Sequence, residues 1–151
     1  MPSAKSWIRH PRLDPLAFAR FEDQMKNRFD KHYTREEASA LIPKLRGWLQ
    51  RVNELREELT KCDKRLGGLR AAGEDLGGDL VAKWIKIIAE IKQVVDEFQR
   101  REIIIKDIER GLLDFPAIIG GREVFLCWEK DEEKVEFWHE LDAGYAGRER
   151  L

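Results

Sequence analysis

The sequence predicts an α+β domain: a long antiparallel helical hairpin packed on a small antiparallel β-sheet, with an N-terminal helical arm. Apolar residues recur every three or four positions in two long stripes separated by a glycine-rich stretch, which is typical of paired helices. A later region alternates apolar and polar residues in short runs, which is typical of strands. We expect a single domain over 33–151, with the hairpin at 34–101, the sheet at 103–142 and a C-terminal turn at 143–151.

Residues 1–32 are expected to form a basic arm outside this domain. Residues 1–33 hold seven basic and four acidic side chains, a local charge of +3 (7 − 4) in a chain whose net charge is −1. Asp14 followed by Pro15 predicts an N-cap and a first-turn proline, and hence a short helix over about 15–29. Such a small basic excess favours a solvated, partly ordered arm over a nucleic-acid-binding segment.

The first long helix has a clear predicted start. Thr34 and Glu37 form a capping box. Pro43 lies soon after, so we expect either a kink near residues 39–43 or a restart with Pro43 in the first turn. The stripe in this helix keeps coiled-coil spacing for four heptads. The two predicted stripes are Leu41, Leu45, Trp48, Val52, Leu55, Leu59, Cys62, Leu66 and Leu69, then Val81, Trp84, Ile88, Ile91, Val95 and Phe98.

A polar turn at residues 130–133 predicts the register of the last two long strands. Centred there, the hairpin would pair Trp128 with Val135, Leu126 with Phe137, Val124 with His139 and Glu129 with Lys134. One face would then be almost wholly apolar and would lie on the helices, with His139 in it. The other face would carry Phe125, Cys127 and Trp138, and two aromatic rings there suggest that a second subunit or the arm covers it.

Composition limits the functional classes. The net charge of −1 gives no global field that would favour DNA or an anionic membrane, so neither is an expected partner. The two cysteines, Cys62 and Cys127, form neither a disulfide framework nor a CxxC zinc motif. No run of about 18 apolar residues exists to span a membrane, and no apolar segment follows the basic N-terminus as in a secretory signal. We therefore expect a soluble cytoplasmic protein with reduced thiols.

Several motifs resemble one known family. They are Tyr33–Ala38 with Leu41-Ile42-Pro43, Lys106–Pro116, Gly121–Val124, Leu126–Trp128, and Trp138–Gly144 with Gly147-Arg148. Over about residues 33–151 the chain resembles the bacterial domain-of-unknown-function family 2203, and Pro43 matches the start of that family's pattern. The resemblance implies a small bacterial cytoplasmic protein and supports the architecture, but the family has no established activity to carry over.

Candidate site residues gather in the last third of the chain. Asp107, Asp114, His139 and Arg148 are the candidate ligand-binding residues. His139 with Asp107 and Glu109 could hold a divalent metal, since imidazole and carboxylate ligands suit Mn, Fe or Zn. The favoured alternative is a hydrogen-bonded core histidine, with Asp114 capping a turn.

Three further sites are weaker. Cys127 could be a nucleophile paired with His139, but the predicted register puts them on opposite faces. The run Gly144–Arg148 could wrap an anion, although a turn that fixes the C-terminus is favoured. Trp128 and Trp138 could form a stacking floor, although core or interface packing is favoured.

Two functions remain open. The first is a non-enzymatic homo-oligomeric or partner-binding protein, expected to be a dimer, whose interface includes Phe125 and Trp138 on the sheet. The hairpin would add an apolar flank formed by Leu49, Ile85, Ile87 and Val94. The alternative is a protein that binds a small ligand or a divalent metal, catalytic or not, around His139. No catalytic residue is assigned, and the enzyme class is the less favoured one.

Overall fold

The computed structural model describes residues 27–76 and 78–151. The chain divides into two units, Met1–Asp30 and Lys31–Leu151. The short helix expected over about 15–29 lies almost wholly outside the described residues. In the second unit, no helix within the described residues combines the length and the apolar character needed to cross a membrane.

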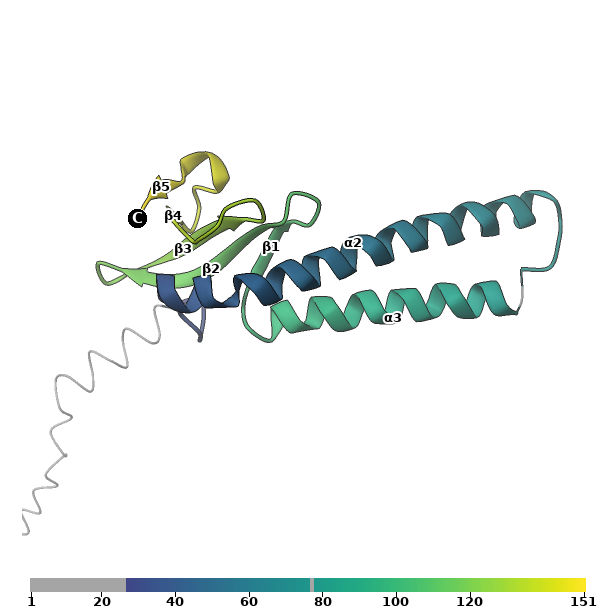
Figure 1. Cartoon of the computed structure of the whole chain (residues 1–151), viewed down its shortest axis with the longest axis horizontal. Helices are drawn as coiled ribbons and strands as arrows, with labels where there is room; N and C mark the ends of the chain where they lie inside the picture. Colours follow the sequence, from purple (N-terminus) through teal and green to yellow (C-terminus); the bar gives the residue numbers. More distant parts are fainter. Residues whose placement is uncertain (1–26, 77) are drawn as a thin grey trace, which may run out of the picture. The chain divides into compact units, whose positions relative to one another are not determined.

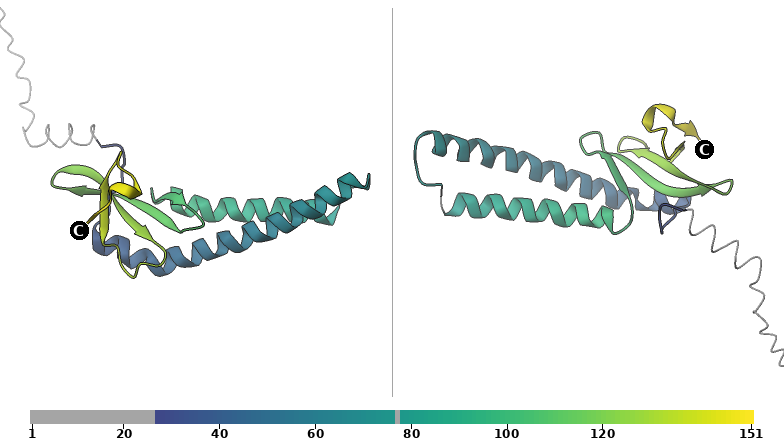
Figure 2. Two further views of the ribbon diagram at one scale, coloured as in Figure 1. Left: turned by 90° about the horizontal axis from the view of Figure 1, so that it is seen from above. Right: turned by 180° about the vertical axis from the view of Figure 1, so that it is seen from behind.

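Two antiparallel helices, α2 (Arg35–Ala71) and α3 (Asp79–Gln99), form the hairpin (Figure 1). The capping box is confirmed: Thr34 Oγ1 accepts from the Glu37 amide at 3.1 Å, and the Glu37 carboxylate accepts from the Thr34 amide at 2.9 Å. The predicted restart at Pro43 is wrong, because α2 runs continuously through that residue. Figure 2 shows α2 curving gently along its length.

The seam between the helices follows the predicted stripe on α2 more closely than on α3. Leu45, Val52, Leu55 and Cys62 are buried as expected. On α3, Phe98 is buried as expected, and Trp84 and Ile91 pack in the seam. Ile87, at 4% exposed, takes the place expected for Ile88, which is 39% exposed, so Ile87 belongs to the seam rather than to a free flank.

Five strands form one antiparallel sheet in sequence order. They are β1 (Ile104–Asp107), β2 (Leu112–Ile119), β3 (Arg122–Glu129), β4 (Phe137–Glu140) and β5 (Glu149–Arg150). One face packs on the first turns of α2 and the end of α3, and the α+β prediction is confirmed. In Figures 1 and 2 the C-terminal segment, residues 143–151, lies on the side of the sheet away from the helices. The core between sheet and helices includes Ala38, Ile42, Leu45, Leu49, Phe98, Leu113, Phe115, Val124, Leu126, Trp128 and Val135.

The register of β3 and β4 differs by one residue from the predicted one. Leu126 pairs with Trp138 and Phe125 pairs with His139. A one-residue slip moves every side chain of a strand to the other face. Trp138 therefore packs toward the helices, where His139 was expected, and His139 faces away from them.

Val135 explains the slip. It leaves the β ladder and is buried against α2. The Val135 amide donates to Ser39 Oγ at 3.2 Å, and its carbonyl accepts from Arg35 Nε at 2.9 Å. The connection between β3 and β4 consequently spans residues 130–136 rather than the four-residue turn that the sequence suggested.

Candidate metal site

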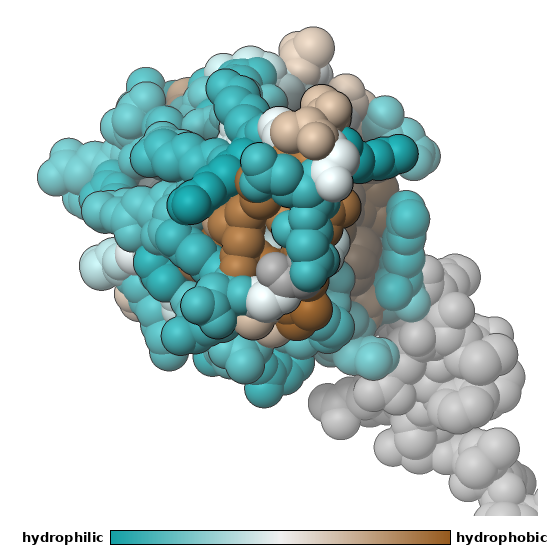
Figure 3. All heavy atoms as spheres, turned by 90° about the vertical axis from the view of Figure 1, so that its right-hand side faces the viewer, coloured by the Kyte–Doolittle hydropathy of each residue, from teal (hydrophilic) through white to brown (hydrophobic). Residues whose placement is uncertain are grey.

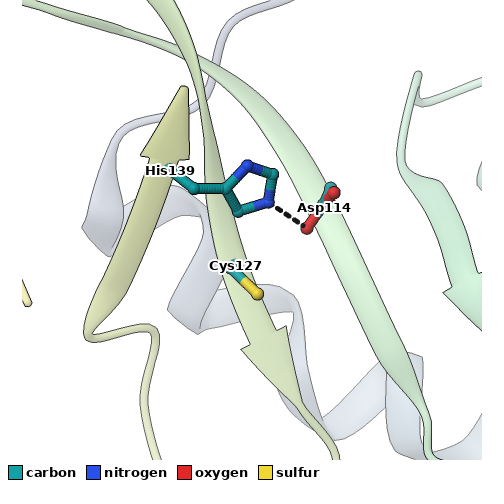
Figure 4. Close-up of side chains that lie close together, drawn as sticks. All are labelled: Asp114, Cys127 and His139. Atoms are coloured by element: carbon teal, nitrogen blue, oxygen red, sulfur yellow. Dashed lines mark hydrogen bonds and ion pairs between the residues drawn. The ribbon is translucent and has the colours of Figure 1, made fainter. Parts of the chain in front are cut away.

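Three chemically active side chains meet on the sheet face that points away from the helices. Asp114 on β2 lies opposite Cys127 on β3. His139 on β4 lies opposite Phe125, which is two residues from Cys127 along β3 and therefore on the same face of the sheet. Figure 4 shows the Asp114, Cys127 and His139 side chains pointing toward one another. Their oxygen, sulfur and nitrogen atoms lie within 4.8 Å of one another. Asp114 and Cys127 are 0% exposed and His139 is 2% exposed, so these polar side chains form a cluster that is buried from solvent.

The hydrogen bonds of His139 determine its tautomer. Its Nδ1 lies 2.8 Å from the Glu140 carbonyl oxygen, which can only accept, so Nδ1 carries a hydrogen. In the neutral ring Nε2 then holds a lone pair. Nε2 lies 3.1 Å from Asp114 Oδ1. Two acceptors cannot face each other at this distance without a positive species between them, so the pair requires a shared proton or a metal ion.

Asp114 is the least satisfied group of the cluster. Its Oδ2 atom is buried and has no hydrogen-bond partner among the described residues. Burial raises the pKa of Asp114, and the nearby His139, Lys106 and Cys127 thiol only partly oppose that rise. A buried polar atom without a partner costs about 1–3 kcal/mol. A ligand that bound to this oxygen would remove that cost.

Cys127 is not poised as a nucleophile. Burial, with a smaller contribution from the Asp114 charge, raises the pKa of the Cys127 thiol to about 12, and the Arg148 guanidinium opposes the rise. A thiol with so high a pKa stays protonated and unreactive near neutral pH. The prediction that Cys127 and His139 lie on opposite faces is nevertheless wrong, because the slip in register brings them to the same face.

Arg148 reaches the cluster from the C-terminal segment. It interacts with Cys127, and its Nη1 pairs with Glu132 Oε1 at 2.7 Å. Its guanidinium also stacks between two rings, 4.1 Å from the centre of Phe137 and 4.2 Å from that of Tyr145. Because the Arg148 guanidinium already has these partners, it is not a free anion-binding group. The structure therefore favours the alternative that residues 144–148 fix the C-terminus.

The structure does not bring together the predicted metal set of His139, Asp107 and Glu109. Asp107 on β1 pairs with Leu112 on β2. His139 is in line with Pro116 on β2, through Phe125 on β3. Leu112 and Pro116 are four residues apart, so Asp107 and His139 are separated by about 13 Å along the strand direction alone. Asp107 Oδ1 instead accepts from the Glu109 and Arg110 amides at 3.0 Å each, as a turn cap. The Glu109 side chain is 76% exposed and pairs with Arg56.

Of the predicted ligand-binding residues, Asp114, His139 and Arg148 are brought together and Asp107 is not. Cys127 completes the cluster and was missed as a ligand. A signal for it existed: the assumed register left Trp138 on the exposed face and His139 on the apolar face. Shifting that register by one residue corrects both placements and brings Cys127 beside His139.

The proposed interface residues also change. Phe125 is 4% exposed and Leu49 is 3% exposed, so neither offers a free surface. Trp138 packs toward the helices, and Trp128 is fully buried in the core, so the two do not form a stacking floor. Ile85, at 57% exposed, remains available to a partner.

The cluster has the chemistry of a transition-metal site. Zinc binds imidazole nitrogen and carboxylate oxygen at about 2.0–2.2 Å, which in a tetrahedral site separates two such ligands by about 3.3 Å. The 3.1 Å between His139 Nε2 and Asp114 Oδ1 is close to that spacing. The bond from His139 Nδ1 to the Glu140 carbonyl is the kind of outer hydrogen bond that orients metal-binding histidines.

Comparison with known proteins gives a family and no function. The model of a family described as "Uncharacterized conserved protein (DUF2203)" matches residues 31–151. No curated protein and no solved structure matches the chain significantly.

Proposed function

We propose a function from the site itself, because the chain belongs to the DUF2203 family, which is described only as an uncharacterized conserved protein. The proposal is that the protein binds one divalent transition metal, of which Zn²⁺ is the best fit, through Asp114, Cys127 and His139. The observation that carries it is the meeting of three buried ligand atoms in which Asp114 Oδ2 has no partner among the described residues.

The donor set indicates which metals fit. A thiolate with an imidazole and one carboxylate favours Zn²⁺ over Mg²⁺ or Ca²⁺, which prefer oxygen ligands throughout. Binding would convert the Cys127 thiol to a thiolate and release its proton. Three protein ligands leave one position of a tetrahedral ion for water or another ligand. The other assignment for the cluster is a proton shared by Asp114 and His139, with a neutral thiol beside them.

Cobalt substitution separates the two assignments. A Co²⁺ ion bound to Cys127 would show an intense sulfur-to-cobalt charge-transfer band in the near ultraviolet, and titration would reach one ion per chain. Cys127→Ser is expected to abolish this band. Cys62→Ser is the matched control, because Cys62 is the other cysteine of the chain and is buried in the helical hairpin. No band in the unaltered protein, or a band that survives Cys127→Ser, contradicts the proposal.

A second proposal is self-association through the hairpin. The sheet covers only the base of the hairpin, and Ile85 and Ile88 on α3 are 57% and 39% exposed. Figure 3, which looks onto the far end of the hairpin, shows an apolar area bordered by hydrophilic side chains. Isolated helices are marginal in water without tertiary packing, so a second copy would stabilise this end. The apolar residues toward this end that are only partly buried are Leu66, Leu69, Leu76, Leu80 and Val81.

Light scattering tests this second proposal. We expect a dimer at micromolar concentration and a monomer for Ile85→Lys. Ile118→Lys is the matched control, because Ile118 is 43% exposed but lies on β2 rather than on the hairpin. A monomeric unaltered protein, or equal dissociation by both variants, counts against an interface on α3.

A further inference from the structure

Helix α3 carries two stripes with heptad spacing, and the rest of the domain packs on only one of them. The packed stripe, spaced 4, 3, 4, 3 and 4, is Leu80, Trp84, Ile87, Ile91, Val94 and Phe98. The second stripe, spaced 4, 3, 4 and 3, is Val81, Ile85, Ile88, Lys92 and Val95. Each of its residues directly follows a residue of the first stripe, so the second stripe lies about 100° further around the helix. Two such stripes are typical of a helix that packs against two neighbours.

The second stripe is apolar, exposed and locally neutral. Ile85 and Ile88 are 57% and 39% exposed, and Val81 is only partly buried. The Lys92 side chain is 74% exposed and pairs with Asp96 at 2.7 Å, so the two charges beside the stripe balance each other within α3. A face of this kind offers little to a strongly acidic or basic partner, and it complements another apolar, neutral face.

The spacing of the stripe matches itself when the helix is reversed. From Val81 to Lys92 the intervals are 4, 3 and 4, which read the same in both directions. An antiparallel second copy of α3 would therefore place Ile85 against the partner's Ile88, and Val81 against the partner's Lys92. A parallel pair would instead bring two Lys92 ammonium groups together. In the antiparallel pair the apolar stem of Lys92 covers a valine while its ammonium group stays in water.

The antiparallel register also brings a carboxylate to a helix end that lacks a side-chain cap. The residue before α3 is Gly78, which has no side chain to accept from the first amides. The first helical hydrogen bond runs from the Ala82 amide to the Gly78 carbonyl, so the amides of residues 79–81 have no acceptor within the helix. In this register Asp96 lies level with the beginning of the partner's α3, where a negative charge is favourable.

We propose that two copies of the chain associate through the second stripe of α3 in antiparallel orientation, and that Asp96 of each copy completes the N-terminus of the other copy's α3. This inference rests on the self-association proposed above, to which it adds the contacting helix face, the orientation and the register. A two-fold axis between the helices makes the two halves of the contact identical. The sheet does not obstruct this contact, because it packs near Val94 and Phe98 on the other stripe.

Cysteine variants test the orientation. Val81→Cys and Lys92→Cys are made in separate full-length proteins, one of which carries a mass tag, and are oxidised alone and as a mixture. We expect a disulfide between the two variants and little between identical chains. In the antiparallel pair, identical positions are about 16 Å apart along the helix axis, whereas a disulfide needs Cα atoms within about 7 Å. The unaltered protein is the control for the native thiols, because Cys62 and Cys127 are both buried.

A charge variant tests the contribution of the partner's carboxylate. Sedimentation equilibrium of Asp96→Asn should give a dimer dissociation constant about 3- to 30-fold higher, since the dimer loses two contacts between a carboxylate and a helix N-terminus. Glu97→Gln is the matched control and should leave the constant unchanged. Glu97 also forms an ion pair within this part of the chain, with Arg101 at 2.6 Å, but it lies on the side of α3 away from the second stripe.

The outcomes separate this contact from self-association itself. Disulfides only between identical chains overturn the antiparallel orientation. Equal dissociation constants for Asp96→Asn and the unaltered protein overturn the role of Asp96. A dimer that forms no disulfide in any mixture overturns the contact between the two α3 helices and assigns association to another surface. A monomer at all concentrations overturns the self-association, and with it this inference.

Discussion

Replacing Asp114 by asparagine separates the metal chemistry of the site from its role in the fold. In the metal-free protein an asparagine amide can donate to His139 Nε2, which holds a lone pair because Nδ1 donates to the Glu140 carbonyl. One buried oxygen is left without a partner, as Asp114 Oδ2 is now. The hydrogen bond to His139 is kept, but the second amide N–H is an additional buried donor, so we expect the free energy of unfolding without metal to fall by about 1–3 kcal/mol.

With metal the two proteins should differ. Zinc at 100 times its dissociation constant stabilises the unaltered protein by about 2.7 kcal/mol. In a chain of this size that corresponds to a rise in Tm of about 5–10 °C. Asp114→Asn loses one negative ligand and should lose most of this rise.

Thermal unfolding followed by circular dichroism, with Zn²⁺ or with a chelator, measures both effects. His139→Leu serves as the contrast, because it leaves a buried carboxyl group without its partner and should cost about 3–5 kcal/mol even without metal. A zinc-dependent rise in Tm that persists in Asp114→Asn would refute the ligand assignment. A loss of more than 3 kcal/mol in metal-free Asp114→Asn would refute the tautomer argument.

Three further predictions concern the fold. Gly111→Ala should be much more destabilising than Gly121→Ala in urea unfolding, because both have positive φ but only at Gly111 would an added Cβ lie 2.7 Å from Lys130 Cβ; equal losses would contradict the close approach. Thr34→Ala should lower the free energy of unfolding by about 1 kcal/mol, since it removes the capping box of α2, and an unchanged urea midpoint would count against that cap. Cys127, at 0% exposed, should resist alkylation in the folded metal-free protein and react on unfolding, as mass spectrometry of the labelled peptide would show; rapid labelling of the native protein would contradict its burial.

The parts of the fold that depend on nearby residues could be predicted from the sequence. The capping box uses Thr34 and Glu37, which are three residues apart, and the stripe on α2 depends only on helical spacing. Pro43 shows the limit of local rules: its penalty predicted a kink or a restart of the helix, yet α2 does not restart there, because packing on the sheet outweighs the local preference.

The site could be predicted only in part, since its composition depends on register. Asp114, His139 and Arg148 stood out because their residue types carry chemistry. Cys127 was excluded because the turn at residues 130–133 gave the wrong pairing. The correct pairing depends on Val135 binding to α2, a contact between residues about a hundred positions apart that no local pattern reveals.

The attachment of Val135 has a consequence for how the site arises. Arg35 and Ser39, in the first turns of α2, hold Val135 in place and so fix the pairing register of β4 with β3. A fragment that begins after the hairpin would lack these two contacts. Its β4 could slide by one position, and His139 and Trp138 would then exchange sides of the sheet. The ligand set is thus assembled by the docking of helix on sheet, and metal binding would report that the whole domain has folded in the right register.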